Sequence, residues 1–335
     1  SCRQGASTAG GAEAGLPHLL AARMGHPKAV VALLAAGAPV DAPNGAGTTA
    51  LLEALSSDAG DSDAVTKILL DAKADPLRSN DAGAVPLAVA AARGKLELTV
   101  RMAGMVEGAC PEALVGAARE GRSDVVGSLL KAGWSATARD GHGVTPLVAA
   151  ATGGDLATVQ LLLENKADPS AGDGSATPLV LAAKKGHGAV MERLLATGVS
   201  LPEPALASAL LFNAVEKGFL PVLEHLLPEG SNPDGPLRNG ATLLHTAAAG
   251  GDLGVVELLV SRNADVNYNN DGNTPLEIAT ENGHWDVVDA LASHGGRSHL
   301  SESTDSISLR LIQRLRLRRL FILQRSCICC ASPRP

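Results

Sequence analysis

The segment Thr145-Pro-Leu-Val-Ala-Ala-Ala-Thr-Gly-Gly154 decides the fold of this chain, because the same ten-residue pattern returns along the sequence. Close copies begin at Thr177, Thr242 and Thr274. Weaker copies begin at Leu16, Thr49, Val85, Glu112 and Ala209. Successive starts are separated by 33, 36, 27, 33, 32, 32, 33 and 32 residues. We therefore predict about nine copies of one small structural unit.

Two slots of the pattern fix the register of the copies. The sixth slot is Ala in all nine copies: Ala21, Ala54, Ala90, Ala117, Ala150, Ala182, Ala214, Ala247 and Ala279. The third slot is His18 in the first copy and Leu in the others: Leu51, Leu87, Leu114, Leu147, Leu179, Leu211, Leu244 and Leu276. Ala in the sixth slot leaves a flat helix side that a neighbour can approach closely. Together with the apolar Leu of the third slot, it is expected to lie in the core.

Each unit is predicted to fold as two short helices joined by turns. In the best copy, Thr145 caps exposed N–H groups and Pro146 occupies a first-turn position where its missing N–H costs nothing. Gly154 suits the left-handed conformation that ends the first helix. The following stretch, 155–164, carries Val159, Leu162 and Leu163 on one face, as a second helix would.

The unit of about 33 residues, with its Thr-Pro-Leu start, resembles the ankyrin repeat, whose signature is T-P-L-H-x-A. The resemblance covers about residues 7–296. It implies an all-α ankyrin-repeat α-solenoid of helix-turn-helix units with β-turn or hairpin loops. Only His245 stands in the family's usual His slot, so the hydrogen bonds of that His are expected to be mostly missing.

Composition and charge divide the chain into three parts. We predict a disordered N-terminal segment over 1–15, a repeat domain over 16–296 and a basic tail over 297–335, disordered or helical. The tail holds eight Arg and two acidic residues, a net charge of +6, whereas the rest holds 20 basic and 33 acidic residues, a net charge of −13. An acidic body does not suit nucleic acid, because binding requires basic charge near the phosphates.

Two irregularities interrupt the repeats. The 27-residue spacing before Glu112 predicts a lost loop or a shortened second helix near 102–105, with loose packing there. The acidic insertion 58–63 is interpreted as a solvated loop, because it lacks the sharp-turn Gly and the distal Glu of a calcium loop.

No catalytic motif is found, so we predict that the chain is not an enzyme and needs no cofactor or metal. Aromatic residues make up 2% of the sequence, which suggests thin stacked elements rather than a deep pocket. Residues 94–96 do not complete a phosphate-binding loop. His26, His187 and His284 follow the helix-ending Gly at one slot, which indicates a repeat position and not a ligand set.

In the ankyrin family, partners bind the concave side of the first helices and the turn tips. By position, that resemblance implies a set of candidate partner-binding residues. At the helix ends these are Arg93, Arg119, Glu120, Lys184, Lys185, Glu216, Lys217, Glu281 and Asn282. At the turns they are His142, Asp173, Arg238, Asn270 and Trp134, the last as an apolar anchor if exposed. Trp285 is expected to pack at the end of the stack.

The function that follows is a non-catalytic interaction module, a scaffold or adaptor that binds a protein partner as a monomer. One alternative is a membrane-tethered adaptor, in which the amphipathic stretch 309–325 lies on an anionic bilayer and the cysteines at 327–330 carry lipid. Another is the regulatory part of a larger protein whose effector domain lies elsewhere. Five cysteines, too few for a disulfide framework, favour a reducing compartment, hence the cytoplasm or the nucleus.

Overall fold

The computed structural model of the chain describes residues 16–172, 176–199, 204–228, 230, 232–235, 240–270 and 272–298. Two compact units divide it, Ser1–Leu206 and Ala207–Pro335. The described ranges hold eighteen helices in pairs, and the prediction of an all-α stack is confirmed. The first unit contains α1 (Pro17–Arg23), α2 (Pro27–Ala35), α3 (Ala50–Ser56), α4 (Ser62–Asp71), α5 (Pro86–Ala92), α6 (Leu96–Ala103), α7 (Pro111–Arg119), α8 (Ser123–Lys131), α9 (Pro146–Gly153), α10 (Leu156–Glu164), α11 (Pro178–Lys185) and α12 (Gly188–Leu195). The start of α13 (Pro204–Glu216) also lies in it, and the second unit continues with α14 (Leu220–Leu226), α15 (Leu243–Gly250), α16 (Leu253–Ser261), α17 (Pro275–Glu281) and α18 (Trp285–Ser293).

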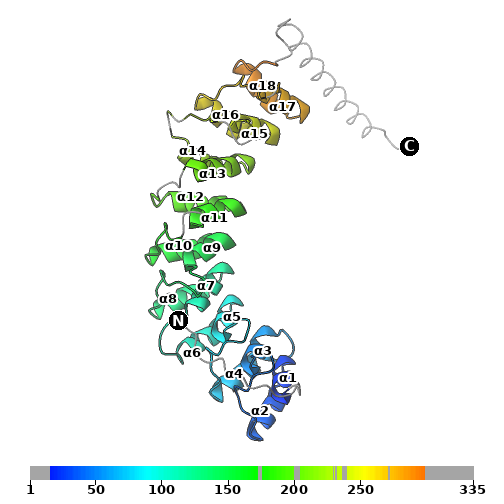
Figure 1. The fold of residues 1–335 in the computed structure, drawn as a ribbon, viewed down its shortest axis with the longest axis vertical. Helices are drawn as coiled ribbons and strands as arrows, with labels where there is room; N and C mark the ends of the chain where they lie inside the picture. The colour runs from blue at the N-terminus through cyan, green and yellow to red at the C-terminus, as the bar shows by residue number, and fades with distance from the viewer. Residues whose placement is uncertain are drawn as a thin grey trace, which may run out of the picture. The chain divides into compact units, whose positions relative to one another are not determined.

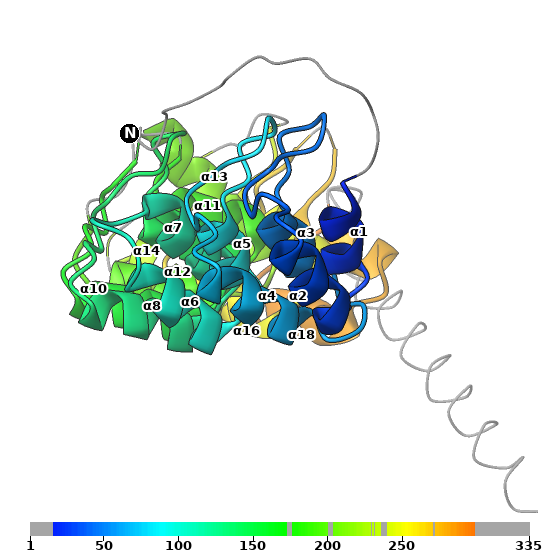
Figure 2. The same cartoon turned by 90° about the horizontal axis from the view of Figure 1, so that it is seen from below.

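Within the first unit, the odd-numbered helices form one layer and the even-numbered helices a second layer (Figures 1 and 2). Each odd-numbered helix packs on the next odd-numbered one, and each even-numbered helix on the next even-numbered one. In the second unit, α15 packs on α17, and α14 on α16 and α16 on α18 in the same way. Each repeat therefore buries its apolar faces against its neighbours along the chain.

The helices begin and end as the repeated pattern predicts. The Thr145 hydroxyl accepts a hydrogen bond from the Val148 N–H at 3.3 Å, with Pro146 at the first helical position. Gly154 then ends α9 in the left-handed conformation, with φ of 86°. Every sixth-slot Ala is buried, with at most 8% of its surface exposed. The third-slot Leu residues are buried too, except Leu211, which is half-buried.

Two repeats depart from the pattern. The helix α13 begins at Pro204, five residues before Ala209, the predicted start of this copy. It buries Leu210, whereas the other repeats bury the third-slot residue, which is Leu211 here. The connection from α6 to α7 has only seven residues, 104–110, whereas α4 to α5 has fourteen, 72–85. Since α6 keeps eight residues, the short spacing comes from a lost loop and not from a shortened helix.

The described connections form tight hairpin-like turns without a sheet. In the loop before α9, the Asp140 N–H donates to the Val144 carbonyl at 3.0 Å and the Gly143 N–H donates to the Asp140 carbonyl at 2.9 Å. The Asp140 carboxylate also accepts the His142 and Val144 N–H groups at 2.9 Å. Before α17, Asn270 and Asn273 form an isolated antiparallel bridge. The prediction of β-turn or hairpin loops is confirmed for these connections.

Candidate functional site

The ends of the first helices carry most of the candidate partner-binding residues. Eight of these side chains are exposed: Arg119, Glu120, Lys184, Lys185, Glu216, Lys217, Glu281 and Asn282. These residues lie just before the helix-ending Gly of their repeats. Arg119, Glu120, Lys184 and Lys185 belong to the first unit, and the other four to the second.

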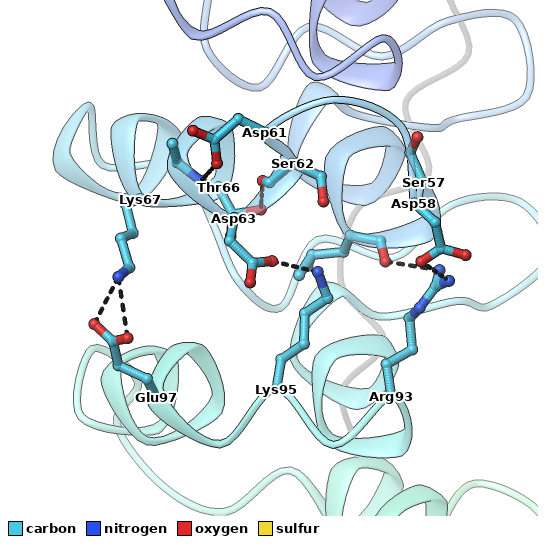
Figure 3. A network of polar contacts seen from close by, with 12 residues as sticks. Ser57, Asp58, Asp61, Ser62, Asp63, Thr66, Lys67, Arg93, Lys95 and Glu97 are labelled. Atoms are coloured by element: carbon cyan, nitrogen blue, oxygen red, sulfur yellow. Dashed lines mark hydrogen bonds and ion pairs between the residues drawn. The ribbon is translucent and has the colours of Figure 1, made fainter.

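Arg93 differs from this group, because its side chain is held within the chain. One guanidinium nitrogen donates to the Leu55 carbonyl at 3.1 Å. Another pairs with the Asp58 carboxylate at 2.6 Å, as Figure 3 shows. Arg93 therefore ties the third repeat to the second, whereas the sequence pattern predicted a partner-facing side chain.

The acidic insertion is largely exposed, as a solvated loop would be, but it also takes part in the same junction. Asp61 caps α4 by accepting the Ala64 N–H at 3.2 Å, and Asp63 pairs with Lys95 (Figure 3). Two further ion pairs continue along α4 and α6: Lys67 with Glu97 at 2.8 Å, and Asp71 with Arg101. We call the four pairs the ion-pair row. Asp63, Lys67 and Asp71 are spaced by four residues, which places them on one helix face.

The turn residues have mixed positions. His142 is exposed at a loop tip, and Asn270 is half-buried beside its bridge partner. Asp173 and Arg238 lie outside the described residues.

The expectation that Trp134 is an exposed anchor is wrong, because only 9% of its surface is exposed. Trp134 occupies the position that Ala74, Ala167 and Ala264 hold in other repeats, directly after the left-handed residue that closes the second helix. Trp134 lines a groove together with Val106, Gly108 and Ala109 of the seven-residue connection. Trp285 is half-buried as the first residue of α18, in the last described repeat.

An open groove of about 530 Å³ remains beside Trp134. It is lined mainly by Val100, Ala103, Val106, Leu129, Ala132 and Trp134, which come from α6, the short connection, α8 and the following turn. The groove borders the stretch 102–105, in which Met102 is itself fully buried. We call it the Trp134 groove. No charged side chain lines it.

The slot after the helix-ending Gly is used in two ways. His187 and His284 place Nε2 at 3.1 and 2.9 Å from the carbonyl oxygens of Thr152 and Ala249 in the preceding repeat. Where the slot is Asp155, the carboxylate instead caps its own second helix by accepting the Thr158 N–H at 2.8 Å. His187 and His284 thus contact the preceding repeat from the common slot that the sequence identified as a repeat position.

His245 makes the contacts expected of the family's His slot. Its Nδ1 accepts the Thr242 N–H at 3.2 Å, and its Nε2 lies 3.2 Å from the Asn273 carbonyl oxygen in the next repeat. Burial lowers the pKa of His245 below its ordinary value, although bonds to backbone groups of Asn273 and Tyr268 oppose this shift. The neutral ring with a proton on Nε2 fits both contacts, since Nδ1 must accept.

Over the part of the chain that the structure describes, no group of three or more His, Cys, Asp or Glu side chains could hold a metal ion. In the same part, no helix combines the length and the apolar character needed to cross a bilayer. The amphipathic stretch 309–325 and the cysteines at 327–330 lie outside it.

Comparisons with known proteins agree with the repeat pattern. A family model described as ankyrin repeats in three copies matches residues 114–203 and 211–301, more than half of the chain. The ankyrin repeat and KH domain-containing protein mask-1 of Caenorhabditis elegans is 33% identical over 118 residues, 34% of this chain. The chain spans about 4% of the length of that relative. The crystal structure of the human ASB11 ankyrin repeat domain matches with a TM-score of 0.51 at 27% identity, covering 64% of this chain and 99% of that domain.

Proposed function

We propose that this chain, which belongs to the ankyrin repeat family, is a protein-interaction module without catalytic activity. Its partner would be a protein that binds the exposed ends of the first helices. Ankyrin repeats are in general protein-interaction modules, but the fold leaves the partner open. The charged side chains at the helix ends would therefore set the specificity.

One observation carries the proposal: α7 and α11 are largely buried, whereas the charged residues at their ends are exposed. In α7, Ala113, Leu114, Val115, Ala117 and Ala118 are buried, and exposure begins at Arg119. In α11, burial likewise ends before Lys184 and Lys185. Since the buried positions maintain the stack, the exposed ends can vary without damage to the fold, which suits partner recognition.

The test is a quantitative affinity capture with the full chain. Arg119→Ala with Lys185→Ala should lower the recovery of specific partners at least fivefold, whereas Lys28→Ala with Lys131→Ala should not. Lys28 and Lys131 are exposed basic residues on the second-helix layer, so this control removes the same charge from the other layer. Equal losses with both variants would indicate a nonspecific effect of charge, and no loss with either would contradict the proposed surface.

The membrane-tethered adaptor and the regulatory part of a larger protein stay predictions, as does the cytoplasmic or nuclear location. Liposome pelleting of the full chain, beside a chain that ends at Ser298, would test the first. Recovery of both chains in the supernatant would contradict membrane attachment through residues 299–335.

A further inference from the structure

The first repeat carries a buried histidine where the other repeats carry leucine. His18 occupies the third slot of the pattern, in α1, and only 1% of its surface is exposed. Its Nε2 atom is buried without a hydrogen-bond partner. His245, the other buried histidine of the described chain, instead has a contact at each ring nitrogen. The core of the first repeat therefore holds a titratable ring whose buried nitrogen is unpaired.

The charged side chains around α1 do not offer His18 a partner. α1 packs on α2, α3 and α4. Besides His18, the charged side chains of these four helices are Arg23, Lys28, Glu53, Asp63, Lys67 and Asp71. Those of α1 and α2 are exposed, the one of α3 is half-buried, and the three of α4 form ion pairs with α6. Over the described residues, none of them forms a hydrogen bond or an ion pair with the His18 ring.

The first repeat is held to the second mainly through α1. The helix α2 buries only Val30, whereas α4 buries five of its side chains. At the end of α1, the Ser57 hydroxyl donates to the Arg23 carbonyl at 2.6 Å. The Asp61 N–H donates to the Gly25 carbonyl at 3.0 Å in the following turn. Since each repeat of such a stack contacts only its neighbours, a repeat at the end can open while the others stay folded.

We propose that His18 makes the first repeat a pH-dependent latch: protonation of the ring releases α1 and α2 from α3 and α4, while the later repeats stay folded. A protonated imidazole has two N–H donors and a positive charge, and the core around Nε2 offers it no acceptor. Opening brings the ring into water and exposes the surfaces of α3 and α4 that the first repeat covers. The latch uses none of the candidate partner-binding residues and goes beyond the proposed function.

The direction of the pH dependence follows from the burial of the ring. Burial lowers the pKa of His18 in the closed repeat below its ordinary value of 6.5. At pH values between 6.5 and the lowered pKa, the open repeat therefore binds a proton that the closed repeat does not. The equilibrium constant for opening rises by up to about tenfold for each pH unit in this range as the pH falls. The latch is closed at neutral pH and opens under mildly acidic conditions.

Hydrogen–deuterium exchange of the full chain, followed by mass spectrometry at pH 7.5 and 5.5, tests the latch. The exchange rate of each peptide is divided by the intrinsic amide rate at the same pH, which leaves the equilibrium constant for opening. We expect this constant to rise by at least threefold, and up to about tenfold, for peptides from 16–36. Peptides from α5 to α12 should show no comparable rise.

Three variants assign the effect to one ring. His18→Leu introduces the residue that the other repeats hold in this slot, and should keep 16–36 equally protected at both pH values. His18→Gln retains a polar side chain that does not titrate in this range, and should also remove the pH dependence. His26→Gln is the matched control, because His26 is exposed in the same repeat, and it should retain the full effect.

Equal protection of 16–36 at both pH values in the unaltered chain would overturn the proposal. A pH effect that persists in either His18 variant would overturn it too, as would a loss of protection that extends equally to α5–α12.

Discussion

The Nε2 atom of His284 lies 2.9 Å from the carbonyl oxygen of Ala249, a residue 35 positions earlier in the sequence. This contact spans one repeat and reaches the end of α15, where carbonyl groups lack partners within the helix. The imidazole also lies over Gly251, so that a Cβ added at this glycine would overlap the ring. The Gly and the His thus form one packing unit across the junction.

His284→Ala is expected to lower the free energy of unfolding by about 1–2 kcal/mol, because the Ala249 carbonyl loses its partner. Gly251→Ala should cost about 1–3 kcal/mol, since φ is 74° there and the methyl group meets the ring. In the chain that carries both His284→Ala and Gly251→Ala, the imidazole is absent. The loss of free energy of unfolding that comes from the clash between the methyl group introduced at position 251 and the ring should therefore vanish. Urea midpoints of the four chains measure this coupling, and strict additivity would contradict it.

Leu147→Ala and Leu179→Ala should each lower the free energy of unfolding by roughly 2–5 kcal/mol through a cavity in the core. Both side chains are at most 2% exposed, in α9 and α11. Leu253→Ala, at a side chain 36% exposed, is the control and should cost clearly less. Chemical denaturation followed by circular dichroism measures the differences; unchanged midpoints for both core variants would be incompatible with the register.

Stability should fall as the pH decreases below about 6.5. Burial lowers the pKa values of His245 and His18 in the folded chain from the ordinary 6.5. At pH values between 6.5 and the lowered pKa values, these two His residues are protonated in the unfolded chain but not in the folded chain. Their contribution to the free energy of unfolding is therefore complete only above pH 6.5 and is lost as the pH falls. His245→Gln should reduce the loss in urea midpoint between pH 7.5 and 5.5. His142→Gln, at an exposed tip, should retain the full loss.

Arg93→Ala should destabilise the chain by about 1 kcal/mol, because it removes the bond to the Leu55 carbonyl and the pair with Asp58. Arg119→Ala should change stability by less than about 0.5 kcal/mol, as expected of an exposed side chain. The Arg93 effect should shrink in 0.5 M NaCl, since salt screens the exposed pair. Thermal unfolding of both variants at two salt concentrations tests this, and equal effects would contradict the assigned role of Arg93.

Lys166→Gly should stabilise the chain by up to about 1 kcal/mol. Lys166 ends α10 with φ of 63°, a conformation that costs a side chain with a Cβ but not glycine. Asn263→Gly is the matched control in the equivalent position, with φ of 64°, and should gain less because Asn tolerates this region. A lower melting temperature for Lys166→Gly would mean that the Lys side chain contributes more than the strain costs.

The repeat, its register and its core could be predicted from the sequence because they depend on residues within one unit. Thr145, Pro146 and Gly154 act on the helix that they begin or end, and each sixth-slot Ala faces a neighbour built on the same pattern. The lost loop before α7 was also visible, since a missing segment changes the spacing of the slots.

The environment of the candidate residues could not be predicted in the same way. Arg93 and Asp58 are 35 residues apart in sequence and meet only because two repeats stack. Trp134 is buried beside Val106 and Ala109 of the short connection in the preceding repeat, which no feature of its own turn reveals. The helix α13 begins early, at Pro204, and has no Thr-Pro pair at its start. The slot pattern therefore located this repeat but did not predict where its first helix begins.

The seven-residue connection between α6 and α7 has a consequence for how such a chain can evolve. A deletion of this size inside a globular domain with one shared core would disturb contacts throughout. Here, α5 still packs on α7 and α6 on α8, so both layers run on past the deletion. Each junction is therefore an independent place at which natural selection can lengthen, shorten or remove a loop. New recognition sites can arise one boundary at a time while the other boundaries keep their geometry.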